Sequence, residues 1–469
     1  MRIECIHSAA CLAGIAAQID AVNLAAARPD PFATCEFYLN FLRRPEFADD
    51  RVCLWFLAAF EGSELIGYLA LKETTARTPF CRTRVLDCLV GHEGDRPQVM
   101  ARPAHLAAVI AEFYAWLQGC KRGWDLLELP QQDDTSALYP LPPEVRLTGY
   151  WVRDYPDWDN CTLDIRWNSL RDYFAELSKR FRSATRRQMR RLLTHGQLEL
   201  LTSDNPHTTP ALFELYRSIE SRSWKARTAA GIASSEARAD YFLGLLDARQ
   251  PMRIVIQILL LDGVPIAGLI SGSFVTPSVR GLYALQIAFD DRLSAASPGS
   301  VMLLLGIRHA IEGRYAFFNL LAGFGYYKSR WLARATPTRC AQIYRIGSMR
   351  FWRRICGDLV RLLRRAGGTV QNFNPLRRAQ ATQADEDDAD TYAVHVEATT
   401  AQRDEFSRCI ASAHVGHCEH LSYQELLAAL PFELSVKPTP ESSHLAADTH
   451  RLRPRQPVVA MPQRCDVAQ

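Results

Sequence analysis

The sequence predicts an α/β fold with mixed sheets, built from two similar units in tandem and followed by a flexible C-terminal tail. The chain has 469 residues. Single hydrophobic cores stop growing at roughly 250–300 residues, so at least two domains are expected. Hydrophobic residues make up 48% of the chain and charged residues 23%, which is typical of a globular protein. In each half an apolar hairpin leads to a strand, a helix and a strand, and this repeat predicts two copies of one unit.

The first unit is expected at residues 1–158. Its helices have apolar residues three and four positions apart, and its strands are apolar runs that end at turn residues. The stretch that enters its last helix, residues 94–107, contains no glycine-rich loop, so we expect a degenerate unit with a structural or acceptor-binding role. The predicted elements are helices at 12–26 and 34–44, a hairpin at 52–73, a strand at 83–91, a helix at 103–120 and a strand at 124–130.

The second unit is expected at residues 160–346 and repeats this order. A single helix is predicted from 169 to 193, and it holds seven basic residues between 179 and 191. The hairpin turns at Asp262-Gly263. The other predicted elements are a strand at 197–202, helices at 210–227 and 235–248, a hairpin at 253–274, a strand at 280–290, a helix at 299–313 and a strand at 315–323.

The remainder of the chain has a different composition. Residues 347–368 predict a basic amphipathic helix, which either packs on the protein's own core or lies on an anionic membrane surface. Residues 369–469 predict a mostly disordered tail with one short helix at 422–432, because acidic, polar and proline-rich stretches bury little apolar surface. The apolar residues that share a face of the basic helix are Phe351, Trp352, Ile355, Leu359, Leu362 and Leu363.

Charge and cysteine content narrow the class of protein. A net charge of +4 is small for this length, so only local patches favour an anionic partner. The 13 cysteines form no disulfide framework, which indicates reduced thiols and a cytoplasmic protein. Polar residues interrupt the first 20 residues, and no apolar run of about 18 residues occurs, so neither a signal peptide nor a membrane span is expected. The spacing of histidines and cysteine at 414–420 fits no zinc site, so no metal is predicted.

Two stretches of the second unit suggest chemistry. Lys328 lies in "FGYYKSRW", directly after an apolar strand; it either reaches the surface or faces a cleft that takes an anion. A strand that ends at Asp290 is followed by a small-residue loop at 294–300 and an apolar helix. Helix N-termini bind phosphate where the loop allows close approach, although the same loop also suits an ordinary helix start. Nucleotide-binding glycine motifs are absent from the sequence.

An ordered set of residues extends these stretches, from the arginine-rich helix at 179–191 onward. It comprises Trp224, Tyr283, Gln286, Phe289, Asp290, Ser297-Pro298-Gly299, Gly323, Tyr327-Lys328 and Trp331. Over residues 160–335 this set resembles the GNAT-superfamily acyltransferases of the CelD-like type, which are relatives of the Fem-type aminoacyltransferases with two GNAT units. Residues 1–158 match only as a degenerate first unit. The family often has histidine where this chain has Glu220, and aspartate where it has Asn319.

This resemblance implies an N-acyltransferase. The donor would be an acyl thioester of coenzyme A or of a carrier protein's phosphopantetheine, and the acceptor an amine of a small molecule or an envelope-polysaccharide precursor. Lys328 would face the developing negative charge, Tyr327 would donate a hydrogen bond to the acceptor and Glu220 would take its proton. The residues implied in binding are Gln286, Ser297, Gly299 and Ser300 for the thioester cofactor, and Trp224, Arg187, Asn319 and Trp331 for the acceptor. The aromatic residues also suit plain packing.

Two further functions remain open. Fem-type relatives use aminoacyl-tRNA, so transfer from aminoacyl-tRNA to a peptidoglycan precursor is the runner-up. The seven basic residues at 179–191 would suit tRNA, an acidic carrier protein or acceptor phosphates, and they also suit a solvated helix face. The third function is a non-catalytic binding protein on the same fold. Nucleic acid other than tRNA is not expected, and residues 347–368 suggest peripheral contact with the inner face of the membrane.

Overall fold

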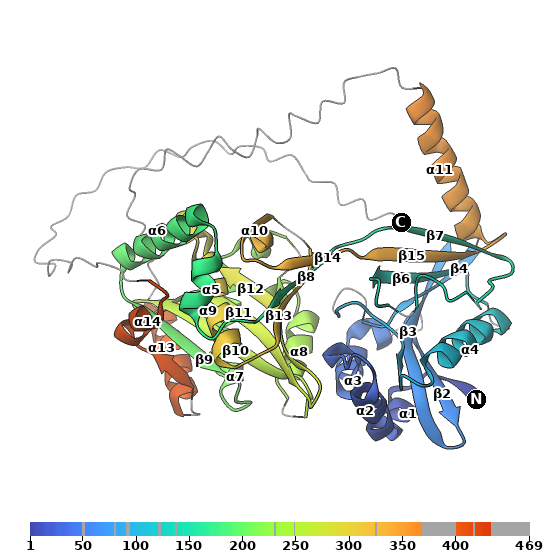
Figure 1. Ribbon diagram of the computed structural model, residues 1–469, viewed down its shortest axis with the longest axis horizontal. Helices are drawn as coiled ribbons and strands as arrows, with labels where there is room; N and C mark the ends of the chain where they lie inside the picture. Colours follow the sequence, from blue (N-terminus) through green and yellow to red (C-terminus); the bar gives the residue numbers. More distant parts are fainter. Residues whose placement is uncertain are drawn as a thin grey trace, which may run out of the picture. The chain divides into compact units, whose positions relative to one another are not determined.

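The computed structural model describes residues 1–48, 52–78, 81–90, 94–120, 123–136, 138–143, 145–228, 231–247, 249–323, 326–367, 400–415 and 418–432. These residues form two eight-stranded sheets with helices packed on them (Figure 1). Each sheet contains both antiparallel and parallel neighbours. The prediction of an α/β fold with two tandem units is confirmed.

The first sheet has the strand order β1-β2-β3-β4-β6-β15-β7, and β5 pairs with β3. Its strands are β1 (Arg2–Ile6), β2 (Val52–Glu61), β3 (Glu64–Thr78), β4 (Cys81–Cys88), β5 (Met100–Ala101), β6 (Leu126–Gln132), β7 (Tyr150–Pro156) and β15 (Arg339–Arg345). The helices of this half are α1 (Ala9–Gly14), α2 (Ala16–Ala25), η1 (Pro31–Ala33), α3 (Cys35–Leu42), η2 (Pro45–Ala48) and α4 (Leu106–Gly119).

The second sheet has the strand order β14-β8-β13-β12-β11-β10-β9-β16. Its strands are β8 (Asn160–Asp164), β9 (Leu198–Ser203), β10 (Arg253–Leu261), β11 (Val264–Val275), β12 (Arg280–Phe289), β13 (Phe317–Ala322), β14 (Arg334–Thr336) and β16 (Glu419–Leu421). Its helices are α5 (Leu170–Glu176), α6 (Lys179–His195), α7 (Thr209–Glu220), η4 (Trp224–Arg227), η5 (Ile232–Ser234), α8 (Glu236–Leu245), η6 (Asp291–Ala296), α9 (Pro298–Glu312) and α10 (Tyr326–Ser329).

The two halves share one topology. In each, three antiparallel strands (β2-β3-β4 or β10-β11-β12) are followed by a helix and a strand that returns parallel to the third. Parallel neighbours need such a crossover, and a helix usually provides it. The parallel pairing is short in both sheets: 85–87 pairs with 126–128, and 281–283 pairs with 317–319. The repeat expected from the sequence is therefore present in the backbone.

One strand crosses between the halves. β15 lies at the end of the second unit in sequence, yet it pairs with β6 and β7 of the first sheet. β8 lies at the start of the second unit and pairs with β13 and β14 of its own sheet. A boundary at residue 346 therefore divides the sequence differently from the sheets, because residues 339–345 belong to the first sheet.

One helix expected from the sequence is two helices in the structure. Leu177 and Ser178 are extended, and they separate α5 from α6. The Ser178 hydroxyl accepts a hydrogen bond from the Phe181 N–H at 3.3 Å, so it caps the new helix. The apolar periodicity alone does not reveal this break, because a capping serine can also lie inside a helix.

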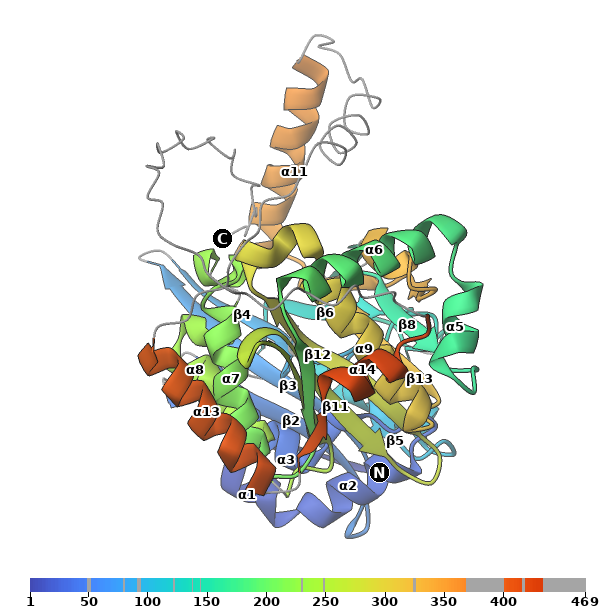
Figure 2. The same ribbon diagram turned by 90° about the vertical axis from the view of Figure 1, so that its left-hand side faces the viewer.

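The tail contributes to the second half. Residues 369–399 and 433–469 lie outside the described residues, but 400–432 contain α13 (Thr400–Val415), β16 and α14 (Tyr423–Ala429), where the sequence predicts only one short helix. β16 pairs with β9, and α13 lies beside α7 (Figure 2). Phe406 and Leu426 are buried there. Among the described helices, none combines the length and apolarity needed to cross a bilayer.

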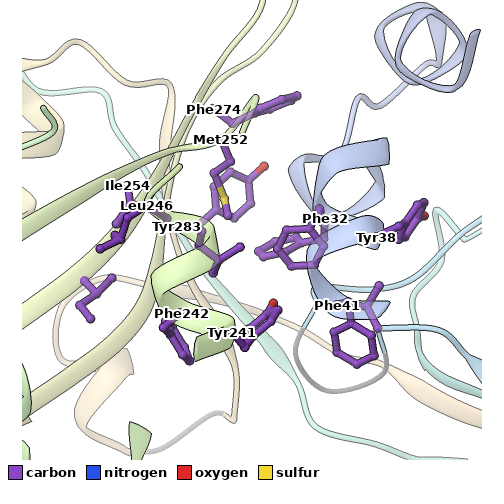
Figure 3. Packing of buried hydrophobic residues seen from close by; sticks show 14 of the residues in the cluster. Phe32, Tyr38, Phe41, Tyr241, Phe242, Leu246, Met252, Ile254, Phe274 and Tyr283 are labelled. Carbon is purple, nitrogen blue, oxygen red and sulfur yellow. The ribbon is translucent and has the colours of Figure 1, made fainter. Parts of the chain in front are cut away.

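The largest core belongs to both halves. It joins α2 and α3 of the first half to α7, α8 and one face of β10 in the second. Phe32 meets Tyr283 edge-on at 5.5 Å between ring centroids, and Phe41 meets Tyr241 in the same way at 5.9 Å (Figure 3). Asn40 Nδ2 donates to the Tyr241 carbonyl at 2.9 Å. Two further cores cover the remaining faces, one beneath α5, α6 and α9 and one beneath α4.

The shared core predicts that both halves unfold together. Phe37 is 1% exposed and packs edge-on against Phe32 and Tyr241. Phe37→Ala should lower the free energy of unfolding by about 3–5 kcal/mol, since it leaves a buried cavity. Urea denaturation followed by fluorescence and circular dichroism should show one transition at lower urea. Val275→Ala, at a half-exposed position, is the control and should shift little. Two transitions, with only one shifted, would contradict a shared core.

Candidate active site

The candidate active site is a fork between β12 and β13. The two strands pair only over 281–283 and 317–319. β12 then continues to Phe289 beside β11, while β13 stays beside β8. Beyond the pairing, the open edge of β12 meets no other strand among the described residues. Backbone N–H and C=O groups along such an edge can pair with an extended ligand that carries amides.

β12 carries a bulge at the fork. Its register against β11 passes from Ile270–Gln286 to Ser271–Ala284, so Leu285 is the extra residue. The extra residue of a bulge is left out of the ladder. Its backbone N–H is therefore suited to donate to a ligand oxygen, as backbone N–H groups do when they stabilise an oxyanion.

The start of α9 lies at the far end of β12. Ser297 precedes the helix with a φ of 50°, and Pro298 begins it. At Gly299 an added Cβ would lie 2.8 Å from Phe289 Cδ1, so glycine is needed for this close approach of helix and strand. The N–H of Ser300 donates to the Ser297 carbonyl at 2.9 Å. The positive end of the α9 dipole is thereby fixed beside the end of β12.

Arginines of α6 add positive charge near this helix start. α6 packs against α9 and η6, and Arg191 Nη1 donates to the Ala295 carbonyl at 3.1 Å. Arg187 and Arg190 are exposed on the same helix. Together with the helix dipole, these guanidinium groups favour an anion such as phosphate.

Lys328 is buried at the end of β13. Its ammonium donates to three successive carbonyls, those of Leu320, Leu321 and Ala322, at 2.8, 3.3 and 3.1 Å. Leu321 has a φ of 57°, and this left-handed turn brings the carbonyls to one point. Burial lowers the pKa of Lys328. The lysine thus ties α10 to the strand end, and it does not reach the surface, which was one of the two placements expected from the sequence.

Asn319 joins the fork to the first half. Its Oδ1 accepts from the Leu321 N–H at 2.8 Å, and its Nδ2 donates to Asp95 Oδ2 at 2.7 Å. Asp95 is buried and also accepts from Asn160 Nδ2 at 2.5 Å and from Arg96. An aspartate at 319 could not donate to Asp95, and two carboxylates would then meet in a buried place. This explains the asparagine at a position where the resembling family often has aspartate.

A cavity of about 280 Å³ opens beside the fork. Leu285, Gln286 and Leu321 line it from the fork, Arg238 from α8 and Phe32 from the first half. Both halves of the chain therefore form its wall. Its size is close to that of small-molecule sites, which start at about 300 Å³.

A buried ionic pair holds Gln286. Lys225 Nζ donates to Gln286 Oε1 at 2.6 Å and lies 3.6 Å from Glu220 Oε1. Glu220 is fully buried and Lys225 is 9% exposed. Burial lowers the pKa of Lys225, while the Glu220 carboxylate opposes that change. The pair therefore lies next to a residue of the cavity wall, although neither of its members lines the cavity.

A larger cavity of about 540 Å³ lies between the halves. Its wall includes Arg28, Arg96 and Asp133 from the first half and Tyr283 from β12. Arg96 Nη1 donates to Asp133 at 2.9 Å, and Arg28 lies 3.6 Å from the same carboxylate. The charges of this wall are therefore largely paired with one another.

The remaining predicted residues lie apart from one another. Trp224 is 45% exposed in η4, and Tyr327 is 54% exposed on α10. Trp331 is buried and meets Phe181 edge-on at 4.7 Å, which is the geometry of a packing residue. The structure links Glu220 through Lys225 to Gln286, which lines the small cavity. It brings Asn319 and Lys328 together at the end of β13, and Ser297, Gly299 and Ser300 at the start of α9.

Sequence reasoning did not single out Lys225, Arg238 or Asp95. Lys225 follows Trp224, and Arg238 lies in a predicted helix, but neither pattern indicates a position beside Gln286. Asp95 lies in the first half, 224 residues from Asn319, so no local signal could pair them. Within the described part of the chain, no group of three or more His, Cys, Asp or Glu is placed to hold a metal, and His417 lies outside that part.

The pairing of Asn319 with Asp95 predicts a compensating pair of substitutions. Asn319→Asp should lower the free energy of unfolding by at least about 1–3 kcal/mol, because a buried acceptor then faces a carboxylate. Adding Asp95→Asn should recover most of that loss, because a donor again faces an acceptor. Thermal and urea denaturation of the single and double variants would measure this. Additive losses in the double variant would show that the two residues are not coupled.

Comparisons with known proteins agree with this architecture. Residues 179–329 match the family described as "Acetyltransferase (GNAT) domain". No curated protein sequence matches the chain. The segment at 179–329 contains α6, α9, the fork strands and all of α10, so the family match includes the fork.

Solved structures similar to this chain include L-PGS from Bacillus licheniformis, with 14% identity, a TM-score of 0.41, and 66% of this chain and 89% of that chain covered. A tandem GNAT protein from the clavulanic acid biosynthesis pathway has 13% identity and a TM-score of 0.40, with 74% and 99% covered. A conserved protein of unknown function from Bacteroides thetaiotaomicron has 12% identity and a TM-score of 0.44, with 73% and 100% covered. Residues 179–329 thus match a GNAT acetyltransferase domain, and this match supports an acyltransferase.

Proposed function

We propose that the protein transfers an acyl group from a thioester to an amine of a small molecule or an envelope-polysaccharide precursor. The fork is the observation that carries this proposal, because an open strand edge, a bulge and a helix start occur together there. These three features suit, in turn, the amide-containing arm, the reacting carbonyl and the phosphates of an acyl-coenzyme A. A carrier protein's phosphopantetheine has the same arm and suits the same edge.

The donor would enter along the open edge of β12. Amides of its pantetheine arm would pair with the backbone there, in the manner of an added strand. Its phosphates would lie at the start of α9, near Ser297, Gly299 and Ser300, within the field of the α6 arginines. Binding thus relies on backbone groups and helix charge.

The reaction needs little covalent help. The acceptor amine attacks the thioester carbonyl, the negative charge gathers on the carbonyl oxygen, and the carbon–sulfur bond then breaks to release a thiolate. The N–H of Leu285, the extra residue of the bulge, would donate to that oxygen. Holding donor and amine side by side accounts for much of the rate enhancement.

The small cavity is the proposed acceptor site. It lies against Gln286, and Arg238 adds positive charge to its wall. The proton released by the amine would pass to the Glu220–Lys225 pair, while Tyr327 on α10 would donate to the acceptor and the exposed Trp224 would contact it. Lys328 and Asn319 act here as positioning residues, since both hold the end of β13.

The exposed arginines of α6 favour a second donor, an aminoacyl-tRNA whose aminoacyl group would pass to a peptidoglycan precursor. tRNA binding through these arginines would weaken steeply with salt, since each phosphate contact releases counterions. An acidic carrier protein could use the same helix.

Binding of acetyl-coenzyme A is the first test of the proposal. Native mass spectrometry should detect the complex with wild type, and Ser300→Glu should weaken binding roughly tenfold or more, or by about 1.4 kcal/mol. A glutamate in the first turn repels phosphate yet suits the helix, so the fold should be kept. Ser278→Glu, at an exposed turn, is the matched control. If the wild type binds no acyl-coenzyme A of any chain length, the inferred donor would instead be a carrier protein or a tRNA.

The Glu220–Lys225 pair predicts a loss in turnover. Glu220→Gln keeps the side-chain size and removes the base, so kcat should fall about 10²- to 10⁴-fold with little change in KM for the thioester. Release of free thiol from acetyl-coenzyme A, with a panel of amino sugars and small amines, would measure this. Glu214→Gln, at an exposed position on the same helix, is the control. Full turnover in Glu220→Gln would remove the pair from the mechanism.

A further inference from the structure

α11 (Met349–Gly367) has one exposed apolar side. Met349 is 51% exposed, Trp352 54%, Leu359 54% and Val360 45%, and Cys356 is exposed as well. At 3.6 residues per turn these five positions fall within an arc of about 100°. Large apolar side chains on a protein surface are ordinarily scattered, so a continuous stripe indicates a surface that binds something.

The helix contacts the first sheet with a neighbouring flank, and no described residue covers this stripe. Phe351 meets Trp151 of β7 edge-on at 6.0 Å, and Asp358 accepts from Arg153 at 2.9 Å. Ile355 is partly buried on the same flank. Packing on the protein's own sheet therefore accounts for Phe351 and Ile355, but not for Trp352 and Leu359.

The opposite flank of the stripe is basic. The helix contains six arginines and one acidic residue, Asp358. That carboxylate is already engaged by Arg153 and Arg354, at 2.9 and 3.2 Å. Arg353 is exposed and lies next to Val360 on the helical wheel, at this border of the stripe. An apolar stripe with arginines along one border suits insertion among lipid headgroups, with the guanidinium groups at the phosphates.

We propose that α11 binds the surface of a bilayer that contains anionic phospholipids and lies in the plane of the headgroups. The apolar stripe would be buried at the acyl boundary, and the arginines would pair with headgroup phosphates. The border of arginines favours this partner over a second copy of the chain, which would have to bring like charges together. The inference goes beyond the transfer reaction and does not rest on it.

Vesicle flotation of the full chain tests the inference. The protein should float with vesicles of phosphatidylcholine and phosphatidylglycerol, much less with phosphatidylcholine alone, and less as salt rises. Trp352→Glu and Leu359→Glu should each weaken partitioning about tenfold or more, because each places a charge in the apolar stripe. Arg353→Gln should weaken it about fivefold, from about 1 kcal/mol per arginine near the surface. Trp158→Glu is the matched control, since Trp158 is 63% exposed outside α11.

Wild type that does not float with the anionic vesicles would overturn the inference. So would equal flotation of wild type and Trp352→Glu, because the contact would then lie elsewhere. Sedimentation velocity tests whether a second copy of the chain binds the stripe instead. A wild-type dimer that Trp352→Glu dissociates, together with no vesicle binding, would assign the stripe to a second copy. Circular dichroism of each variant would confirm that these surface substitutions leave the fold intact.

Discussion

The first sheet is completed by a strand from the far end of the other half of the chain, and the rest of the structure depends on that crossing. β15 comes at the end of the second unit and lies between β6 and β7, while β8 comes at its start and lies beside β13 of its own sheet. β15 gives backbone hydrogen-bond partners to both β6 and β7, so neither strand faces an unpaired edge there. The large core between α3, α7 and α8 then buries the facing surfaces of both halves.

This arrangement gives the first half a part in the site. Asp95 accepts a hydrogen bond from Asn319 of β13, and Phe32 forms part of the wall of the small cavity. The two contacts act on the fork from outside the domain that contains it. The first half has no glycine-rich loop of its own, but it supports the fork. Without it, the fork would lose a buried hydrogen bond and part of the cavity wall.

Charge is distributed differently in the two surfaces for which we propose partners. At the fork the positive potential comes from a helix end and from arginines on α6, which suits compact phosphates bound close to backbone. At α11 the arginines border an apolar stripe, which suits phosphates spread over a lipid surface. The two buried lysines belong to neither surface. Lys328 donates to three carbonyls, and Lys225 contacts Gln286 and Glu220.

The sequence by itself determined the fold class and the repeat of hairpin, strand, helix and strand. These follow from local periodicity and turn chemistry, which act over a few residues. It did not determine the break at Ser178, because a capping serine can also lie inside a helix. Nor did it determine the strand that crosses between the halves or the helix and strand of the tail, because those depend on pairing between distant segments.

Tertiary structure alone decided the surroundings of the candidate residues. Lysine after an apolar strand suggested a cleft or the surface, yet the left-handed turn at Leu321 provides three carbonyls that satisfy the buried ammonium. Asn319 departs from the pattern of the resembling family, and its hydrogen bond to Asp95 gives the physical reason. Burial and hydrogen bonding depend on which groups, distant in sequence, lie close together in the fold. A single sequence does not show which groups these are.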